Sequence, residues 1–549
     1  MTGEAVVNIA TALADAARRD PSAPALILPD GSRVSYRDLD ADADRIARGL
    51  AAAGVVPGTR TVLMVPPGRE FFPLVFGLFR AGAVPVVVDP GMGVARMRSC
   101  LAEASPGAFI GIARAHAARV FLGLGGSTVR IRIGVGGCFG LGGLSLAEVR
   151  RRGGGGGVAP LATKASDMAA ILFTSGSTGP PRGAVYTHGN FAAQVEMVRR
   201  TFGIEPGEVD LPTFPLFALF DPALGMTTVV PEMDPARPAR ADPSKIARAI
   251  LENGVTTMFA SPGLLDPLSR YCELKQVRFP SLRRVISAGA PVSPRIVERM
   301  AKALPEGALL HTPYGATEAL PVASIDHRTI LGETRARSAE GAGICVGRPV
   351  AGVEVRCIRV DDGPIASWTP DLEVPRGTPG EFCVRGPQVT AGYFARPDAD
   401  ALTRIPDPAG GFWHRMGDVG YLDDSGRVWF CGRKSQRVRT AEGDLYPDQC
   451  EAVFNEEMIV DRTALVGVGD VGRQLPVLCF SAPAFSHEPT GDEFTTRLSG
   501  EGRKAACTRV IEDFLRFPTE LPVDSRHNAK IQREALSRWA AKRLGESGS

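Results

Sequence analysis

Short apolar runs and helical repeats alternate through the N-terminal part of the chain. Residues 25–28, 61–65 and 84–88 are apolar runs of the length typical of buried strands. Between them, apolar side chains recur at helical spacing over 39–50 and again over 70–81. This strand–helix–strand order predicts an α/β fold with a largely parallel sheet covered by helices.

The same alternation continues in the middle of the chain. The pattern predicts a helix over 191–202 and strands over 255–260 and 284–287. Further on, a strand over 428–431 follows the turn 424–426, which indicates a hairpin.

Residues 121–157 break the pattern. The segment contains Gly-Gly pairs and a run of five glycines from 153 to 157, and 129–133 is its one clear strand. A composition of this kind is typical of a poorly ordered surface excursion, so we expect no chemistry there.

A Pro-interrupted, Phe-rich stretch occupies 210–226. Because proline breaks a helix, Phe214, Phe217 and Phe220 cannot share one regular helix. Two interpretations stay open: core packing of a connector, or an apolar wall for a greasy substrate.

Composition narrows the function class. At 549 residues the chain is long enough for at least two domains, and its 44% apolar and 22% charged content is that of an ordinary globular protein. A net charge of +3 with no basic, aromatic-interleaved stripe argues against a nucleic-acid partner. Residues 1–20 have the pattern of an amphipathic helix and not of a signal peptide, and no apolar window is long enough for a membrane span.

The ten cysteines are scattered singly, with no C-x-x-C pair. This spacing favours reduced core thiols over zinc ligands or disulfides, and with it a cytoplasmic location.

The most informative stretch is 171–183. Three apolar residues, 171–173, end a strand, and every residue from Thr174 to Gly183 is Gly, Pro, Ser or Thr except Arg182. Glycines let backbone N–H groups approach an anion closely, and the hydroxyls and the cation add further donors. The stretch lacks the Walker A pattern. We interpret it as a polyphosphate-binding loop, with a flexible surface turn as the ordinary alternative.

Four later stretches are candidate parts of a site, and the last three of them carry charged residues. The turn 288–291 follows a strand, at the edge where open α/β sheets bind ligands. Next come His311-Thr-Pro-Tyr-Gly-Ala-Thr-Glu318, Met416-Gly-Asp-Val-Gly-Tyr421 and Lys530-Ile-Gln-Arg533. Taken singly, a helix-capping Glu, a turn Asp and a solvated Lys are the ordinary interpretations of their charged residues.

The loop sequence T-S-G-S-T-G-P-P-R-G resembles the signature of the adenylate-forming superfamily, which comprises acyl-CoA synthetases, nonribosomal peptide adenylation domains and luciferases. The other stretches follow it in the superfamily's order. The resemblance implies a large N-terminal domain of mixed, largely parallel sheets layered with helices, and a small mobile C-terminal α+β domain. The hinge would lie at Ser435, which divides the chain into 1–434 and 435–549.

The resemblance also implies ATP and Mg²⁺ as cofactors. It assigns nucleotide contacts to Thr174, Ser175, Gly176, Ser177, Thr178, Gly179, Arg182, Gly289, Ala290, Tyr314, Gly315, Thr317, Asp418 and Arg433. Glu318 would hold Mg²⁺, a hard cation that prefers oxygen ligands. The catalytic residues would be Lys530, Glu318, Thr178 and Arg182. His188 and His311 lie close to motifs, but we expect both to be structural.

Within the superfamily, the stretches between about residues 210 and 531 look like the β-lactone synthetases of bacterial long-chain olefin biosynthesis. The implied reaction adenylates a long-chain 2-alkyl-3-hydroxy acid, whose own 3-hydroxyl then closes a β-lactone. Assembly with other olefin-pathway enzymes is implied in the same way. Ala218 stands where relatives often carry a gating His, which predicts a more open acyl site.

Two alternatives stay open. A long-chain acyl-CoA or acyl-AMP ligase would share all the nucleotide motifs. A non-catalytic binding protein is suggested by Arg182, where the superfamily usually has Lys, because a planar guanidinium and a compact ammonium are not interchangeable.

Overall fold

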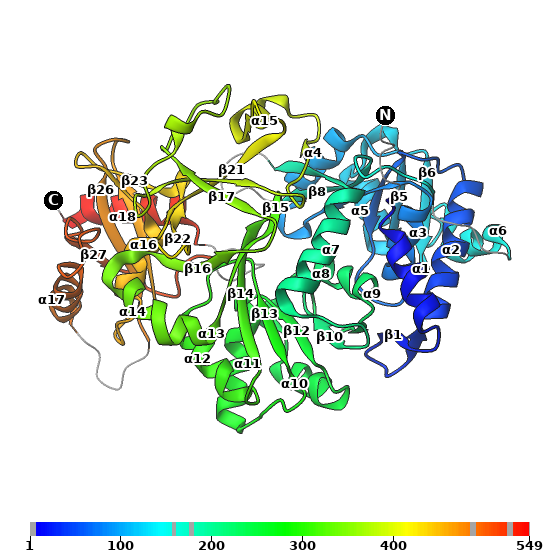
Figure 1. The fold of residues 1–549 in the computed structure, drawn as a ribbon, viewed down its shortest axis with the longest axis horizontal. Coiled ribbons are helices and arrows are strands. Elements are labelled where there is room, and N and C mark those ends of the chain that lie inside the picture. The colour runs from blue at the N-terminus through cyan, green and yellow to red at the C-terminus, as the bar shows by residue number, and fades with distance from the viewer. Residues whose placement is uncertain (1–6, 156–160, 175–180, 484–489, 524–530, 548–549) are drawn as a thin grey trace.

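The structure is a computed structural model that describes residues 7–155, 161–174, 181–483, 490–523 and 531–547. Two large sheets dominate it (Figure 1). The eight-stranded sheet has the order β19-β9-β8-β4-β3-β5-β6-β7. Its strands are β3 (Arg60–Met64), β4 (Val84–Val88), β5 (Ala108–Ile112), β6 (Ile131–Val135), β7 (Leu144–Ser145), β8 (Met168–Thr174), β9 (Arg182–Thr187) and β19 (Gly392–Tyr393).

The second sheet has fourteen strands. These are β1 (Pro24–Ile27), β2 (Arg33–Ser35), β10 (Val209–Pro212), β11 (Thr227–Val229), β12 (Thr257–Ala260), β13 (Arg284–Ser287), β14 (Leu309–Ala316), β15 (Ala319–Asp326), β16 (Ile344–Pro349), β17 (Glu354–Ile358), β18 (Gly380–Arg385), β20 (Arg404–Pro406), β21 (Phe412–Leu422) and β22 (Val428–Arg433). Strands β11, β10, β12, β13 and β14 run parallel, and pairing becomes antiparallel from β14 onward. The predicted α/β fold of mixed, largely parallel sheets is therefore confirmed.

Helices cover the sheets as the apolar repeats predicted. The predicted helices correspond to α2 (Tyr36–Ala52), α3 (Phe71–Arg80) and α7 (His188–Phe202). Ser35 begins α2 by accepting a hydrogen bond from the backbone N–H of Asp38. Together with α1 (Ala10–Arg19), α2 and α3 bury an apolar core that includes Leu13, Ile46 and Phe76.

The expectation of a poorly ordered excursion over 121–157 is wrong for the part that the structure describes. This part contains η2 (Gly126–Thr128), β6, β7 and α6 (Leu146–Gly153), and Ile133 and Val149 are fully buried. Glycine has a packing role here: a Cβ at Gly153, in α6, would lie 2.0 Å from the carbonyl oxygen of Arg45 in α2. The close approach of α2 and α6 therefore explains part of the glycine content from which composition alone predicted a poorly ordered segment.

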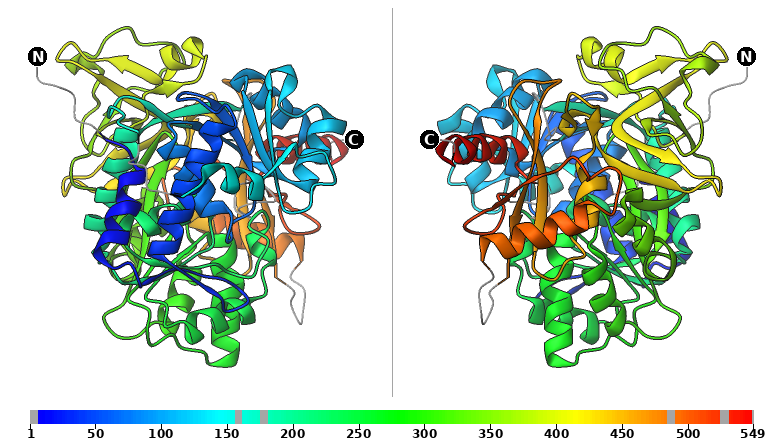
Figure 2. Two further views of the ribbon diagram at one scale, coloured as in Figure 1. Left: turned by 90° about the vertical axis from the view of Figure 1, so that its right-hand side faces the viewer. Right: turned by 90° about the vertical axis from the view of Figure 1, so that its left-hand side faces the viewer.

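After Arg433 the chain forms separate, smaller sheets. These are the hairpin β23 (Val438–Arg439) and β24 (Asp444–Leu445), and a sheet of β25 (Arg462–Val468), β26 (Leu475–Ser481) and β27 (Asp513–Arg516). The helices α16 (Pro447–Phe454), α17 (Gly491–Gly502) and α18 (Arg533–Ser547) accompany them. The orange and red elements of this part lie at one end of the molecule in Figure 1, and Figure 2 shows them from two sides.

Two smaller features complete the picture. All ten cysteines are free thiols, and eight of them are buried. Within the described ranges, no helix has the length and apolar character needed to cross a membrane.

Candidate active site

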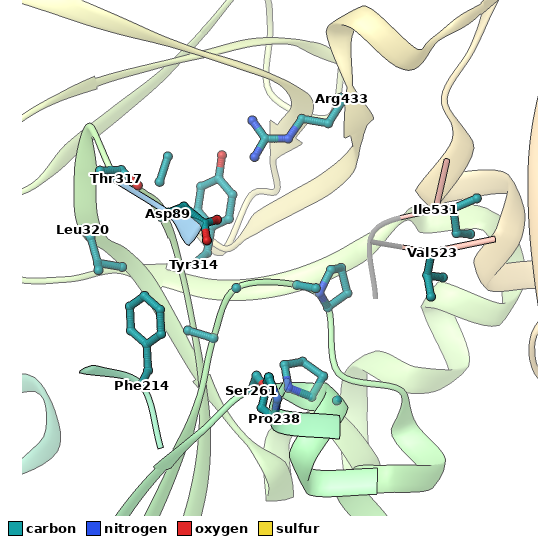
Figure 3. A pocket seen from close by; sticks show the side chains of 18 of the residues that line it. Asp89, Phe214, Pro238, Ser261, Tyr314, Thr317, Leu320, Arg433, Val523 and Ile531 are labelled. Carbon is teal, nitrogen blue, oxygen red and sulfur yellow. The ribbon is translucent and has the colours of Figure 1, made fainter. Parts of the chain in front are cut away.

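A cleft of about 3160 Å³ opens where the two large sheets and the C-terminal elements meet. Thr213, Ser261 and Ala288 line it, each directly after one of the parallel strands β10, β12 and β13. Carboxyl ends of parallel strands are where open α/β sheets bind ligands. Figure 3 shows Ser261, Phe214 and Tyr314 around this space.

Nine of the predicted site residues line the same cleft. They are Arg182, Gly289, Ala290, Tyr314, Gly315, Thr317, Glu318, Asp418 and Arg433. Gly289 has φ +101°, a left-handed conformation that glycine adopts without strain.

Asp418 forms the centre of one polar cluster. The phenol of Tyr314 donates a 2.6 Å hydrogen bond to Asp418 Oδ2, and Arg433 Nη1 lies 3.0 Å from Oδ1. Asp418 and Arg433 face each other in the register of β21 and β22. Burial raises the pKa of Asp418, although Arg433 and Tyr314 oppose the shift, and Asp418 in turn raises the pKa of Arg433. The arrangement fixes a carboxylate and a guanidinium side by side in the cleft wall.

Glu318 is the centre of a second polar cluster. The sequence predicted a role for Glu318 itself but not the side chains that surround it. Tyr393 donates a 2.7 Å hydrogen bond to Glu318 Oε1, and the backbone N–H of Thr390 donates to the Glu318 carbonyl at 2.8 Å. The guanidinium carbons of Arg182 and Arg404 each lie 5.4 Å from the centre of the Tyr393 ring. Burial and the Glu318 charge raise the pKa of Tyr393, so its phenol stays protonated as a donor.

A third tyrosine holds the neighbouring backbone. Tyr186 on β9 donates its phenol hydrogen to the carbonyl oxygen of Thr317. The chain has only seven tyrosines, and Tyr186, Tyr314 and Tyr393 all lie at this site. Scarcity alone did not single out Tyr186 and Tyr393, because the other four tyrosines do not line the cleft.

The predicted phosphate loop begins and ends in the hairpin of β8 and β9. Thr174 and Arg182 are paired at its open end, which confirms that the stretch follows a buried strand. The predicted contacts Ser175, Gly176, Ser177, Thr178 and Gly179 lie outside the described residues.

The predicted catalytic Lys530 also lies outside the described residues. The described residues that flank this stretch, Val523 and Ile531, form an isolated antiparallel bridge, and both line the cleft. Figure 3 shows these two side chains on the wall opposite Thr317 and Leu320.

One branch of the cleft is apolar. Phe214, Phe217, Phe220 and Phe259 line it, and the rings of Phe217 and Phe259 stack at 3.9 Å. The Phe-rich stretch folds as two short helices, α8 (Pro215–Ala218) and α9 (Phe220–Leu224). Both interpretations of this stretch hold: Phe217 is buried in a core cluster against which Phe214 and Phe220 pack, and all three also line the cleft. Ala218 itself is buried in the core and does not line the cleft.

The two histidines near motifs have structural surroundings. Burial lowers the pKa of both His188 and His311 to about 4, so both rings are neutral. His188 Nδ1 accepts a hydrogen bond from the backbone N–H of Ile9, and His311 packs edge-on against Phe202. Neither is placed as a base in the cleft.

Comparison with known proteins gives a consistent result. Residues 13–394 match the family described as AMP-binding enzyme. Two proteins named olefin beta-lactone synthetase are each 48% identical to the chain: that of Stenotrophomonas maltophilia (strain K279a), with 98% of both chains covered, and that of Xanthomonas campestris pv. campestris, with 97% of both. The crystal structure of ATP-bound MatB from Rhodopseudomonas palustris has a TM-score of 0.77 and 21% identity, covering 98% of this chain and 99% of its own.

Proposed function

This chain belongs to the AMP-binding enzymes and, among them, to the olefin β-lactone synthetases, and we propose that it converts a long-chain 2-alkyl-3-hydroxy acid and ATP into a β-lactone, AMP and pyrophosphate. The observation that carries this proposal is the coexistence, in one cleft, of the Asp418 and Glu318 clusters with an apolar branch. A nucleotide and a greasy acid can meet there.

The Asp418 cluster is suited to ribose. A carboxylate accepts hydrogen bonds from both hydroxyls of a vicinal diol, and Asp418 is held for this by Tyr314 and Arg433. Gly289 and Ala290, in the turn after β13, would flank the adenine together with Tyr314. Thr174, the loop residues up to Gly179, and Arg182 would face the phosphates.

The Glu318 cluster is suited to Mg²⁺. Within the described residues, no group of three His, Cys, Asp or Glu side chains could hold a metal alone. A single carboxylate completed by phosphate oxygens is a normal magnesium site, so the donor set fits. Glu318 would hold the ion, which when bound offsets negative charge on the phosphates. Tyr393 holds the carboxylate in place.

The reaction needs two displacements. The acid's carboxylate attacks the α-phosphorus, and pyrophosphate leaves; Lys530 and Arg182 would stabilise the developing negative charge. The 3-hydroxyl then attacks the acyl carbonyl, the C–O bond of the four-membered ring forms, and AMP leaves while the hydroxyl proton passes to solvent. Because both reacting groups belong to one molecule, holding the chain in the reactive rotamer against the phenylalanine wall supplies much of the acceleration.

The division at residue 434 belongs to the same proposal. The segment Lys434–Gln436 joins β22 to the smaller C-terminal sheets, where a hinge would let the part carrying Lys530 move relative to the cleft. We also propose a cytoplasmic location and assembly with other olefin-pathway enzymes, which co-purification from cells would test.

One experiment separates the proposal from its alternative. The purified protein is incubated with ATP, Mg²⁺ and a 2-alkyl-3-hydroxy acid, without coenzyme A, and the products are identified by mass spectrometry. We expect AMP, pyrophosphate and the β-lactone. The matched acid lacking the 3-hydroxyl should stop at the acyl adenylate. AMP and pyrophosphate without lactone, or strict dependence on coenzyme A, would show an acyl ligase instead.

A further inference from the structure

Two carboxyl groups lie buried behind the phenylalanine wall, outside the nucleotide site. Asp210 on β10 and Asp221 on α9 are both 0% exposed, and their side chains share a hydrogen bond. Asp221 Oδ2 also accepts a 3.0 Å hydrogen bond from the hydroxyl of Thr228. Thr228 is the residue paired with Asp210 between β10 and β11. The Asp221 side chain therefore reaches back from the wall onto the sheet beneath it.

A hydrogen bond between two carboxyl groups requires a proton on one of them. Apart from each other and the backbone N–H of Leu211, which acts on Asp210, both oxygens of Asp210 and Oδ1 of Asp221 have no hydrogen-bond partner within the described residues. The charge of Arg284 acts on Asp210, but its guanidinium is engaged by Glu208 and also donates a 2.8 Å hydrogen bond to the hydroxyl of Thr257. Within the described part of the chain, neither Asp210 nor Asp221 forms an ion pair, so two buried negative charges at this position would be poorly compensated.

The other ionisable groups facing the pair do not change this conclusion. Tyr36, from α2, donates its phenol hydrogen to the Met226 carbonyl, and burial raises its pKa, so it stays neutral. Arg19, from α1, lies beside Gly225 at the end of α9, and its charge acts on the phenol of Tyr36. Burial opposes ionisation of Glu208, but Arg284 more than offsets it and lowers the Glu208 pKa, so this group adds a negative charge.

The connector held by the pair is the one that forms the apolar branch. Residues 213–226 leave the sheet at the end of β10 and rejoin it at β11, with α8 and α9 between. Asp221 is the second residue of α9, between Phe220, which lines the cleft, and Leu224, which is buried. Phe217 and Phe220 pack at 5.8 Å, so movement of α9 would move the wall.

We propose that Asp210 and Asp221 are positioning residues: they share a proton, and this pair holds the phenylalanine wall in the shape that accepts the acyl chain. The inference rests on the proposed function of the apolar branch. Burial raises the pKa of both carboxyl groups, and the charge of Asp210 raises that of Asp221 further. The shared proton is therefore retained at neutral pH and lost under alkaline conditions. Two adjacent carboxylates would then repel each other and loosen α9.

The test compares wild type with Asp210→Asn, whose amide donates to Asp221 without needing the shared proton. We expect the wild-type KM for the 2-alkyl-3-hydroxy acid to rise by about tenfold or more as the pH is raised from 7 through the alkaline range, because each pKa unit of differential interaction corresponds to a tenfold change. The KM for ATP, measured in parallel, should not follow it. Asp210→Asn should keep a nearly constant KM for the acid, whereas Asp210→Ala, which strands Asp221, should raise it at every pH.

Infrared spectroscopy gives a readout independent of activity. Wild type at pH 7 should show the carbonyl band of a buried protonated carboxyl, and this band should shift in Asp210→Asn, where an amide replaces one of the two partners. Absence of this band in wild type, or the same alkaline rise in KM for Asp210→Asn and wild type, would overturn the inference. If wild type forms no lactone at any pH, the proposed function fails, and the infrared band still decides whether the pair shares a proton.

Discussion

Replacing Tyr393 by Phe tests whether Glu318 is the magnesium ligand. The substitution removes one phenol oxygen and with it the 2.7 Å hydrogen bond to Glu318 Oε1. The ring stays, and with it the contacts to Arg182 and Arg404. The change is therefore confined to the support of one carboxylate.

The expected magnitude follows from the charge of the acceptor. A hydrogen bond to a charged group contributes about 1.5–3 kcal/mol. At about 1.4 kcal/mol per factor of ten, its loss from the reacting state lowers kcat/KM by about 10- to 100-fold. Loss of a hydrogen bond that supports a metal ligand reduces metal affinity or activity by a similar factor, about 10- to 100-fold. The Mg²⁺ concentration for half-maximal rate should therefore rise as well.

Pyrophosphate release measured across a Mg²⁺ titration provides the assay, and Tyr186→Phe provides the control. Tyr186 is equally buried and lies on the neighbouring strand, but it donates to the backbone carbonyl of Thr317. Its loss should cost about 0.5–1.5 kcal/mol of folding stability and leave the Mg²⁺ dependence unchanged. If Tyr393→Phe keeps both kcat/KM and the Mg²⁺ dependence within about twofold of wild type, the assignment of Glu318 is wrong.

Three further predictions follow from the same cleft. Lys530→Ala should nearly abolish acyl-adenylate formation while ATP binding, measured by calorimetry, stays largely intact; wild-type turnover in this variant would exclude Lys530 from catalysis. Because burial raises the pKa of Asp418, its carboxylate loses charge on acidification at a higher pH than an ordinary Asp. The wild-type KM for ATP should therefore rise as pH falls, whereas Asp418→Asn should have a high KM with little pH dependence; an equal slope in both would contradict the ribose assignment. Phe217→Ala should lower the free energy of unfolding by about 3–5 kcal/mol in denaturant titrations and shift substrate preference toward bulkier acids, and an unchanged acid profile would argue against a substrate-lining role for this side chain.

The local pattern of the chain determined its elements and the order of its motifs. The predicted strands over 84–88 and 284–287 coincide with β4 and β13, because a short apolar run carries its own evidence of burial. The positions of Asp418, Glu318 and Arg182 in the cleft were expected from the resemblance of their stretches to the adenylate-forming superfamily, because Asp418 and Glu318 taken singly each had an ordinary interpretation.

Only the tertiary structure decided which side chains meet. Tyr314 and Asp418 are 104 residues apart, and Tyr393 and Glu318 are 75 apart, so no local pattern joins them. The Asp210–Asp221 pair forms because the connector that carries α9 returns to the sheet. The sequence around either residue does not indicate this return. Contacts of this kind arise from strand order and helix packing, which depend on the whole chain at once, whereas hydrophobic periodicity depends only on neighbouring residues.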